Sequence, residues 1–382
     1  MIDIRVFDTI ADVPAQWDEL TTDQSLMQSR QCWQLLEDVR LNDIRCRYLT
    51  VYDDNQLVAT TTCYTITTDI AIFAPPKLRS LLKTIRRWWP GFLKLTMLEC
   101  GTPITINPPM ILHAGQNPEP VISSIDSELR RFARTEGAWV IVARDFEAAE
   151  AQHLQIWNHL GYHPVDNLPN TYLDICWQSA AEYQAAMKSY YRSKLRRMLK
   201  KNALQKTHHE LVDNFEDFSE ALCRQWRTVS LNASEYDREE LTPEFYRQFS
   251  ASFGKASKVL LFYRGEEWVG HALLLIDGRC LRWLYFGRET PDNDGLYVYA
   301  AYTVIETAIT LGLESVEGGL TTYGIKKDLG MQMVHTRMAI RSPWKPLNPL
   351  TGLAYQLLNR PAKIHNYAVF KGSTPQDSSN SN

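Results

Sequence analysis

Hydrophobic positions along the chain form short runs that predict a β-hairpin in each half. Residues 46–66 contain two apolar, β-branched runs around an Asp-Asp-Asn turn, and residues 258–276 contain two similar runs around Arg-Gly-Glu-Glu. Apolar runs on either side of a short polar turn are typical of two antiparallel strands. A third strand is expected at 280–287, directly after the second hairpin.

A helix and a strand are expected after each hairpin. The first half has a helix predicted at 121–136 and a strand at 139–143, and the second half has a helix at 296–311 and a strand at 315–317. Each of these helices is closed by a glycine, which is favoured just after a helix end. Each half then has a short helix that ends in Leu-Gly and a final strand, expected at 171–176 and 333–341.

The same order of elements in both halves indicates an internal duplication, with an insertion around 75–98 in the first half. The length of 382 residues also exceeds the roughly 250–300 at which a single core stops growing. The pattern predicts an α+β fold of two tandem domains, each with a mixed, mostly antiparallel sheet flanked by helices. We expect domains at 1–178 and 207–371, a basic linking helix at 179–206, and a disordered polar tail at 372–382.

Composition narrows the class of protein. With 45% hydrophobic and 22% charged residues, the chain is not wholly disordered, a collagen or a coiled coil. No apolar stretch approaches the ~18 residues of a transmembrane helix, and the first residues lack the order of a secretory signal, so a cytoplasmic protein is expected. Seven cysteines without a C-x-x-C spacing, and nine histidines without a convincing ligand pair, predict no metal site.

The net charge of −3 conceals three basic stretches without any acid, at 70–98, 183–209 and 329–376. Local positive fields of this kind suit an anionic ligand, such as a phosphate group, a nucleic-acid backbone or a lipid head group. Each stretch is equally compatible with a solvated face that acids elsewhere in space balance.

Two of these stretches have a clear pattern. The insertion at 75–98 is amphipathic and basic and carries Trp88 and Trp89, so it fits a contact with an anionic membrane, a lid over an acceptor site, or a loop packed on the first domain. The linking helix either contacts a polyanionic donor or is an exposed linker that its charge keeps soluble. Its basic side chains form two ridges, Arg192, Arg196 and Lys200, and Lys194, Arg197 and Lys201.

The most specific pattern is the run Glu-Gly-Gly-Leu-Thr-Thr-Tyr-Gly-Ile-Lys-Lys-Asp-Leu-Gly at 317–330. Its Thr-x-x-x-Lys-x-x-x-Gly spacing resembles the tandem-domain GNAT acyltransferases, as in the Fem peptidyltransferases and the related biotin-synthesis-like acetyltransferase domain. Pro-Ala-Gln-Trp at 14–17 and the Tyr-Arg and Arg-Arg pairs of 191–197 support the resemblance, which covers most of residues 10–341. Leu320 stands where relatives often have arginine. The resemblance implies N-acyl or aminoacyl transfer and names no substrate.

Three residues of this run are candidates for catalysis. Glu317 ends a short strand, where it either takes a proton from an attacking ammonium or forms an ion pair with a basic neighbour. Tyr323 is either a proton donor to the leaving group or a packing residue. Lys326, on which the family pattern also falls, is expected to stabilise an oxyanion from the surface of a helix start. Lys327 is its expected solvent-exposed counterpart.

The expected donor region differs from that of acetyl-coenzyme A enzymes. Of their Arg-x-x-Gly-x-Gly/Ala pyrophosphate loop, Arg288 and Gly295 remain, and Asp294 is a predicted helix cap whose charge opposes a pyrophosphate. Fem-type enzymes also lack this loop, so the resemblance implies aminoacyl-tRNA or a carrier-bound acyl group as donor, with acyl-coenzyme A less favoured and no permanently bound cofactor. The candidate donor-binding residues are Arg192, Arg196, Arg197, Arg288 and Gly295.

These features predict a transferase that moves an activated acyl or aminoacyl group to the amine of a small-molecule or cell-envelope-type acceptor. The second domain is expected to carry out the chemistry, and the first to help hold the acceptor. The alternative is a non-catalytic GNAT-like module that binds an anionic ligand, a carrier protein or a membrane surface. No DNA partner is expected.

Overall fold

The computed structural model describes residues 2–22, 24–69, 84–92, 94–232, 239–358 and 364–372. The chain forms two compact units. Unit 1 comprises Met1–Leu168 and Thr336–Ala362, and unit 2 comprises Pro169–His335 and Lys363–Asn382. Each unit has one mixed sheet with helices packed on it, which confirms the predicted α+β class.

The sheet of unit 1 contains eight strands within the described residues, in the order β1-β2-β3-β4-β6-β15-β7, with β5 paired to β3. The strands from β1 to β4 are antiparallel, β4 and β6 are parallel, and β15 is antiparallel to both β6 and β7. Their bounds are β1 (Ile2–Phe7), β2 (Arg45–Asp53), β3 (Gln56–Asp69), β4 (Lys94–Cys100), β5 (Met110–Leu112), β6 (Val140–Phe146), β7 (His163–Asp166) and β15 (Arg337–Arg341).

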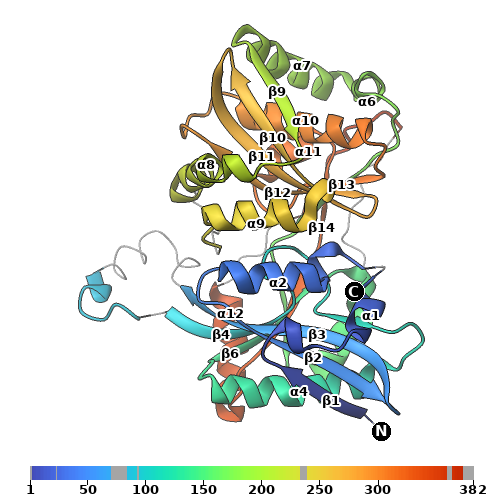
Figure 1. Ribbon diagram of the computed structural model, residues 1–382, viewed down its shortest axis with the longest axis vertical. Helices are drawn as coiled ribbons and strands as arrows, with labels where there is room; N and C mark the ends of the chain where they lie inside the picture. The colour runs from blue at the N-terminus through green and yellow to red at the C-terminus, as the bar shows by residue number, and fades with distance from the viewer. Residues whose placement is uncertain are drawn as a thin grey trace. The chain divides into compact units, whose positions relative to one another are not determined.

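Helices cover both faces of the unit 1 sheet. Successive side chains of β2 point to opposite faces, and large apolar side chains lie on both, so both faces need a cover. The ring of Tyr48 meets Trp17 and Trp33 edge-on at 6.1 and 5.8 Å, while Leu49 and Val51 point the other way into the buried cluster under α4. Figure 1 shows α2 and α4 on opposite sides of this sheet. The helices are α1 (Gln16–Thr21), α2 (Arg30–Val39), α4 (Pro118–Thr135), α5 (Ala151–His159) and α12 (Asn348–Leu358), with 3-10 turns at Ile10–Asp12, Leu26–Gln28, Ala148–Glu150 and Lys345–Leu347.

The sheet of unit 2 contains seven strands within the described residues, in the order β14-β8-β13-β12-β11-β10-β9. β12 and β13 are parallel and the other pairs are antiparallel. The expected hairpins at 46–66 and 258–276, and the strand at 280–287, are confirmed. The bounds are β8 (Asn170–Asp174), β9 (Thr207–Val212), β10 (Ser257–Arg264), β11 (Glu267–Asp277), β12 (Cys280–Arg288), β13 (Ser315–Glu317) and β14 (Gln332–Val334).

Helices also pack on both faces of the unit 2 sheet. On one face, Ala300 and Val304 of α10 join Leu281 and Val316 in the main buried cluster. On the other face, α8 and α9 pack over β12, and Phe245 meets Tyr285 edge-on at 6.1 Å. The helices are α6 (Ala180–Ala186), α7 (Ser189–Leu204), α8 (Ser219–Asn232), α9 (Pro243–Phe253), α10 (Leu296–Thr310) and α11 (Tyr323–Asp328), with 3-10 turns at Glu216–Phe218 and Gly254–Ala256.

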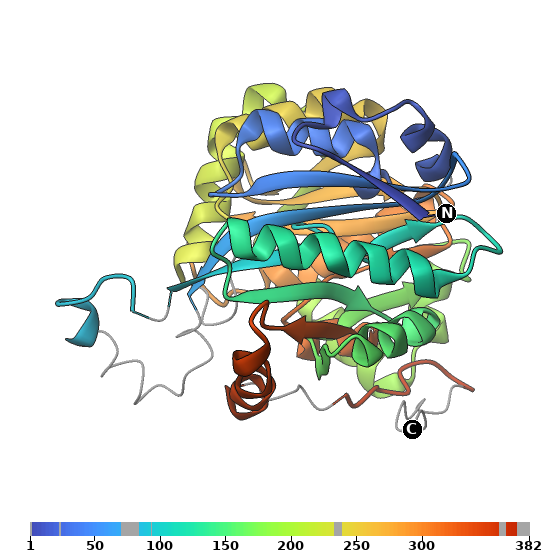
Figure 2. The same ribbon diagram turned by 90° about the horizontal axis from the view of Figure 1, so that it is seen from below.

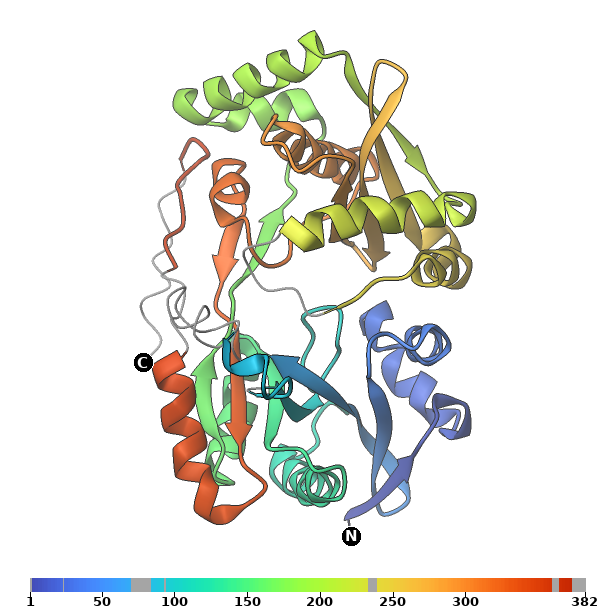
Figure 3. The same ribbon diagram turned by 90° about the vertical axis from the view of Figure 1, so that its left-hand side faces the viewer.

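The final strands of the two halves are exchanged between the sheets, which changes the expected domain boundaries. β8, expected to end the first domain, pairs with β13 and β14 in unit 2. The single strand expected at 333–341 is two strands: β14 stays in unit 2 beside β8, and β15 lies between β6 and β7 in unit 1. Figure 3 shows the green β8 and the orange-red β15, each in the sheet of the other half. The units therefore divide at Leu168 and Thr336, and not at the expected 178 and 207.

The expected linking helix at 179–206 is two helices, and both belong to unit 2. The chain leaves α6 at Met187, which forms a β-bridge with Phe370, and the N–H of Lys188 donates to the carbonyl of Val369 at 2.8 Å. The segment around Val369 and Phe370 therefore pairs with the chain between the two helices. The sequence pattern within 179–206 could not predict this break, because the pairing segment lies far away in the chain. Of the tail expected to be disordered, residues 373–382 lie outside the described ranges.

A buried histidine joins β11 to the two helices on one face of unit 2. Nδ1 of His271 lies 2.8 Å from Oε1 of Gln225, and Nε2 lies 3.1 Å from the hydroxyl of Tyr246. Nε2 of Gln225 donates to Glu289, so Oε1 of Gln225 faces the imidazole and Nδ1 of His271 carries the proton. Burial lowers the pKa of His271 to about 3.

We therefore expect the stability of unit 2 to fall as the pH drops below 6.5. The unfolded chain binds a proton at residue 271 below that pH, while the folded chain does so only near pH 3. The difference costs roughly 1.4 kcal/mol per pH unit, or about 2 kcal/mol between pH 6.5 and 5. Urea unfolding at these two pH values should show this loss in the parent and not in His271→Gln, which keeps one donor and one acceptor. An equal loss in both proteins would assign the acid sensitivity to other groups.

Candidate functional site

The two parallel strands of unit 2 separate at the end of β13. Ser315, Val316 and Glu317 pair with Cys280, Leu281 and Arg282, and there the pairing of the two strands stops. β12 continues to Arg288 and stays paired with β11 on its other side. Sites in sheets of this kind form where the carboxyl ends of parallel strands diverge. Glu317 occupies that position.

Glu317 is buried and held by two donors. Its carboxylate accepts a hydrogen bond from Nη1 of Arg282 at 2.5 Å and one from Nδ2 of Asn170 at 3.0 Å. Arg282 also pairs with Asp277 at 2.7 Å, so two carboxylates share one guanidinium. Burial raises the pKa of the Glu317 carboxyl, and Arg282 and Asn170 oppose that rise. The ion pair expected as one alternative for Glu317 is present.

Lys326 is not the surface residue that the sequence predicted. It is 1% exposed, and its Nζ donates to the carbonyl oxygens of Gly319 at 3.2 Å and Leu320 at 2.8 Å. Thr321 and Thr322 in the same loop have φ angles of 64° and 49°, which are costly for β-branched residues. The loop folds back over the six-residue α11, so its carbonyls reach the lysine.

The other two residues of the run also have partners. Tyr323 donates from its hydroxyl to the carbonyl of Pro169 at 2.9 Å, so its proton is used within the fold. Lys327, expected to be solvent-exposed, is half-buried with its Nζ 4.6 Å from the ring centre of Tyr367, and that prediction is wrong. This ring comes from residues 364–370, a segment near the C-terminus that the sequence patterns did not connect with α11.

The start of β8 completes this site, and the sequence did not indicate it. Asn170 binds Glu317, and Oγ1 of Thr171 donates to the carbonyl of Gly319 at 2.8 Å. A Cβ at Gly318 would lie 2.7 Å from Oγ1 of Thr171 and 2.6 Å from Sδ of Met331, so a larger residue there would have to displace both side chains. Both partners of β8 come from the other half of the chain, which is why spacing within one half could not reveal them.

The expected donor region holds an internal anion. The Asp294 carboxylate accepts the N–H of Leu296 at 3.0 Å at the start of α10, and pairs with Arg264 at 2.6 Å and Arg288 at 2.9 Å. Burial alone would raise the pKa of Asp294, but these donors outweigh it and hold the pKa below its usual value. In phosphate-binding proteins the N–H groups at a helix start bind the phosphate. At the start of α10 the Asp294 carboxylate takes that place.

Gly295 lies against helix α7 and not toward an open donor site. Its φ is 95°, and a Cβ there would come within 2.7 Å of Cε of Met198. Nδ2 of Asn202 donates to the carbonyl of Gly295 at 3.3 Å. The start of α10 is therefore covered by α7 and neutralised by Asp294.

The three arginines predicted on α7 divide into two kinds. Arg192 is half-buried and donates to the carbonyl of Met187 at 3.0 Å, where it satisfies the end of α6. Arg196 and Arg197 are exposed, as are Lys200 and Lys201. Lys194 of the second ridge pairs with Asp328 at 2.5 Å. The basic side chains of α7 that a polyanion could contact are therefore the exposed ones, from Arg196 to Lys201.

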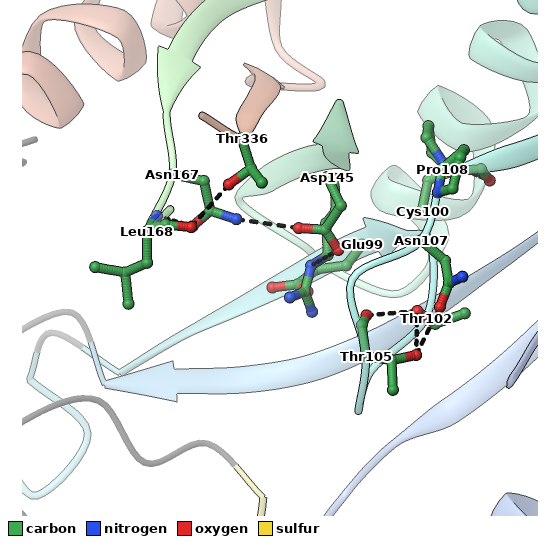
Figure 4. A network of polar contacts seen from close by, with 12 residues as sticks. Glu99, Cys100, Thr102, Thr105, Asn107, Pro108, Asp145, Asn167, Leu168 and Thr336 are labelled. Carbon is green, nitrogen blue, oxygen red and sulfur yellow. Dashed lines mark hydrogen bonds and ion pairs between the residues drawn. The ribbon is translucent and has the colours of Figure 1, made fainter. Parts of the chain in front are cut away.

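Unit 1 carries a second buried polar network that the sequence patterns did not reveal. It lies at the carboxyl ends of β4 and β6, the parallel pair that corresponds to β12 and β13 (Figure 4). The carboxylate of Glu99 accepts from the hydroxyl of Tyr64 at 2.8 Å and from Arg144 at 3.1 Å. Asp145, with a φ of 62°, accepts from Asn167 at 3.0 Å. Charged residues directly after the apolar runs of β4 and β6 were the available signal.

Two further properties follow from the described residues. No group of three or more His, Cys, Asp or Glu side chains in these ranges is arranged to hold a metal ion. None of the helices described is long and apolar enough to span a membrane.

Among curated proteins, the chain matches "Putative 8-amino-7-oxononanoate synthase 2" from two strains of Mycobacterium tuberculosis. In both cases it is 25% identical over 328 residues, which is 83% of this chain and 42% of the relative. The chain thus spans less than half the length of these relatives. No family model matches the chain.

Solved structures match over nearly the whole chain. FemX has a TM-score of 0.54 at 13% identity and covers 93% of this chain and 99% of its own. A tandem GNAT protein from the clavulanic acid biosynthesis pathway has 0.53 at 8%, covering 90% and 99%. The C-terminal domain of a proposed lysylphosphatidylglycerol synthetase from Agrobacterium fabrum has 0.53 at 11%, covering 90% and 95%. The chain therefore has the same fold as these structures, one of which is described as a tandem GNAT protein.

Proposed function

We propose that this protein is an acyltransferase that moves an activated acyl or aminoacyl group onto the amine of a small-molecule or cell-envelope-type acceptor. The observation that carries this proposal is Glu317, a buried carboxylate at the point where the parallel strands β12 and β13 separate. In the proposed reaction, the amine nitrogen bonds to the acyl carbon, and the ester or thioester bond to the donor breaks.

Glu317 is the proposed base. An acceptor amine arrives as an ammonium ion and must lose a proton before its nitrogen can attack. Burial raises the pKa of Glu317 and makes its carboxylate a better proton acceptor, while Arg282 and Asn170 hold it in place. Attack leaves a further proton on the nitrogen, so the amine gives up two protons in all. One leaves with the departing alcohol or thiol and the other is released to solvent, so charge and protons balance.

Lys326 is the proposed source of positive potential for the oxyanion. Its ammonium favours the charged form of Glu317 and is bonded to the loop carbonyls of Gly319 and Leu320. A fixed charge in a buried site stabilises developing negative charge more than the same charge in water. Tyr323 would act as proton donor only after its hydroxyl leaves the Pro169 carbonyl.

The donor is proposed to be a group carried on a larger anionic molecule, such as aminoacyl-tRNA or an acyl carrier protein. Asp294 occupies the helix start at which a coenzyme A pyrophosphate would need N–H donors. Arg196 and Arg197 are exposed and suit a polyanion. The name of one structure with the same fold, a proposed lysylphosphatidylglycerol synthetase, refers to an aminoacylated lipid.

A donor panel tests this function. The purified protein would be incubated with an amine acceptor and, in turn, acetyl-coenzyme A, an acyl carrier protein and aminoacyl-tRNA, and amide products would be identified by mass spectrometry. We expect a product from a carrier or tRNA donor, and neither transfer from nor micromolar binding of coenzyme A. Tight polyanion binding without any product would favour the alternative, a non-catalytic binding module. The pairing of Asp294 with Arg264 and Arg288, which fills the expected donor region, is also compatible with that alternative.

The exposed arginines of α7 provide a separate prediction. If they contact donor phosphates, Arg196→Gln with Arg197→Gln should weaken tRNA binding and flatten its salt dependence by about one unit of log–log slope per lost contact. Arg224→Gln with Arg279→Gln removes the same charge from exposed arginines elsewhere in unit 2 and should leave the slope unchanged. Binding isotherms at several salt concentrations measure both. Equal slopes in the two double variants would exclude a specific role for α7.

A further inference from the structure

The connection between β3 and β4 of unit 1 ends in an ordered turn at 84–92. The N–H groups of Trp88 and Trp89 both donate to the carbonyl of Ile85 at 3.0 Å, and the N–H of Phe92 donates to the carbonyl of Trp89 at 3.0 Å. Figures 1 and 2 show this segment, in cyan, extending away from the sheet of its own unit. We call residues 84–92 the tryptophan tip.

One arginine of the tip binds the end of β3 and also a carbonyl within the tip. The two terminal nitrogens of Arg86 bind the Asp69 carboxylate at 2.6 and 2.5 Å, and its Nε donates to the carbonyl of Phe92 at 3.0 Å. A two-pronged contact of this kind fixes direction as well as distance. The orientation of the tip is therefore built into the fold.

This fixed turn presents two large aromatic side chains to solvent. Trp88 is 91% exposed and Trp89 is 64% exposed, whereas Trp17, Trp33 and Trp157 of the same unit are buried. Within the tip, the ring centre of Phe92 lies 5.4 Å from that of Trp89. Tryptophan combines a large apolar body with one polar N–H, and it is enriched where an apolar phase meets water.

The exposed charged residues next to the two tryptophans in the sequence are both positive. Arg87 and Lys94 are exposed on either side of the two tryptophans. The sequence has no acid between Asp69 and Glu99, and Asp69 itself is paired with Arg86. Exposed aromatics flanked by cations complement a surface that is anionic outside and apolar beneath.

We propose that the tryptophan tip docks this protein on an anionic membrane surface. Trp88 and Trp89 enter the interface between head groups and acyl chains, and Arg87 and Lys94 contact lipid phosphates. Insertion of apolar side chains and electrostatic attraction add to each other, which is how a small contact holds a protein reversibly on a bilayer. This proposal does not depend on the acyltransferase function.

The size of the tip favours a lipid surface over a second protein. Two tryptophans bury at most about 500 Å² between them, since each offers about 150–250 Å². A stable protein interface buries about 800 Å² on each partner. A bilayer has no such requirement, because it accepts single inserted side chains.

Vesicle sedimentation tests the proposal. The full chain would be mixed with vesicles of phosphatidylcholine containing phosphatidylglycerol, and with vesicles of phosphatidylcholine alone. We expect binding to the anionic vesicles, a drop of at least about tenfold in the partition coefficient for Trp88→Ala with Trp89→Ala, and a drop of about 25-fold for Arg87→Gln with Lys94→Gln, at about fivefold per cation. Binding to neutral vesicles should be much weaker.

Trp139→Ala is the matched control, because Trp139 is 53% exposed in the same unit and pairs with Trp344. It should bind anionic vesicles like the parent. The proposal fails if the parent does not bind, if the Trp88/Trp89 variant binds as well as the parent, or if Trp139→Ala loses as much. It also fails if sedimentation velocity shows that the two tryptophans are needed for self-association, because a second copy would then cover them.

Discussion

Replacing Glu317 by glutamine is expected to lower kcat by about 10²–10⁴-fold, the usual contribution of a general base. The amide keeps the size of the side chain, and its one oxygen can still accept from Arg282 or from Asn170, which bind different oxygens of the Glu317 carboxylate. It cannot take a proton from the acceptor ammonium. Arg282 keeps Asp277 as a partner, so the variant should remain folded. Steady-state kinetics and circular dichroism measure both outcomes.

Asp277→Asn separates this role from simple ion pairing. Both variants remove one of the two carboxylates that bind Arg282, so a Glu317 with only a structural role would give similar losses in both. We expect Asp277→Asn to lose stability with only a small change in kcat. The parent should also lose kcat/KM as the pH falls through the raised pKa of Glu317, and that limb should be absent in Glu317→Gln. Equal kinetic losses in the two variants would leave Glu317 without a catalytic role.

Local patterns in the sequence predicted most helices and strands, but they did not predict which distant strands pair with each other. The hairpin at 46–66 was predictable because its apolar runs and polar turn are adjacent in the chain, and Asp54 and Asn55 indeed have φ angles of 48° and 67°. The exchange of β8 and β15 was not predictable, since a strand pattern says nothing about which distant strand it meets. The domain boundaries were wrong for this reason.

The same distinction explains what was missed in the candidate site. The end of β13 at Glu317 was identified from a motif within fourteen residues of sequence, whereas Asn170 and Thr171 come from about 150 positions away. Glu99 and Arg144 of unit 1 interrupt apolar strands, and charged residues at such positions are by themselves a signal of a buried polar pair. Partners that depend on pairing across the whole chain could be found only from the fold.

Lys326→Met is expected to lower kcat by about 10²–10³-fold, the scale of losing one oxyanion donor. Unlike a surface change, it should also destabilise unit 2. The ammonium binds the carbonyls of Gly319 and Leu320, and a buried acceptor that loses its donor costs about 1–3 kcal/mol. Urea unfolding and kinetics would be measured on the same preparation to separate the two effects. Partial unfolding lowers the apparent kcat only in proportion to the fraction of protein that is unfolded, so a 10²-fold loss in a mostly folded variant is a loss of chemistry.

Lys327→Met is the matched control on the next position of α11. Lys327 is half-buried, and the variant loses a contact with the Tyr367 ring at 4.6 Å that is worth about 0.5–2 kcal/mol. Its kcat should stay within a few-fold of the parent, because its charge lies over an aromatic ring and holds no loop carbonyl. Equal kinetic losses in both variants, or a folded and fully active Lys326→Met protein, would show that the buried charge of Lys326 holds the loop and takes no part in the chemistry.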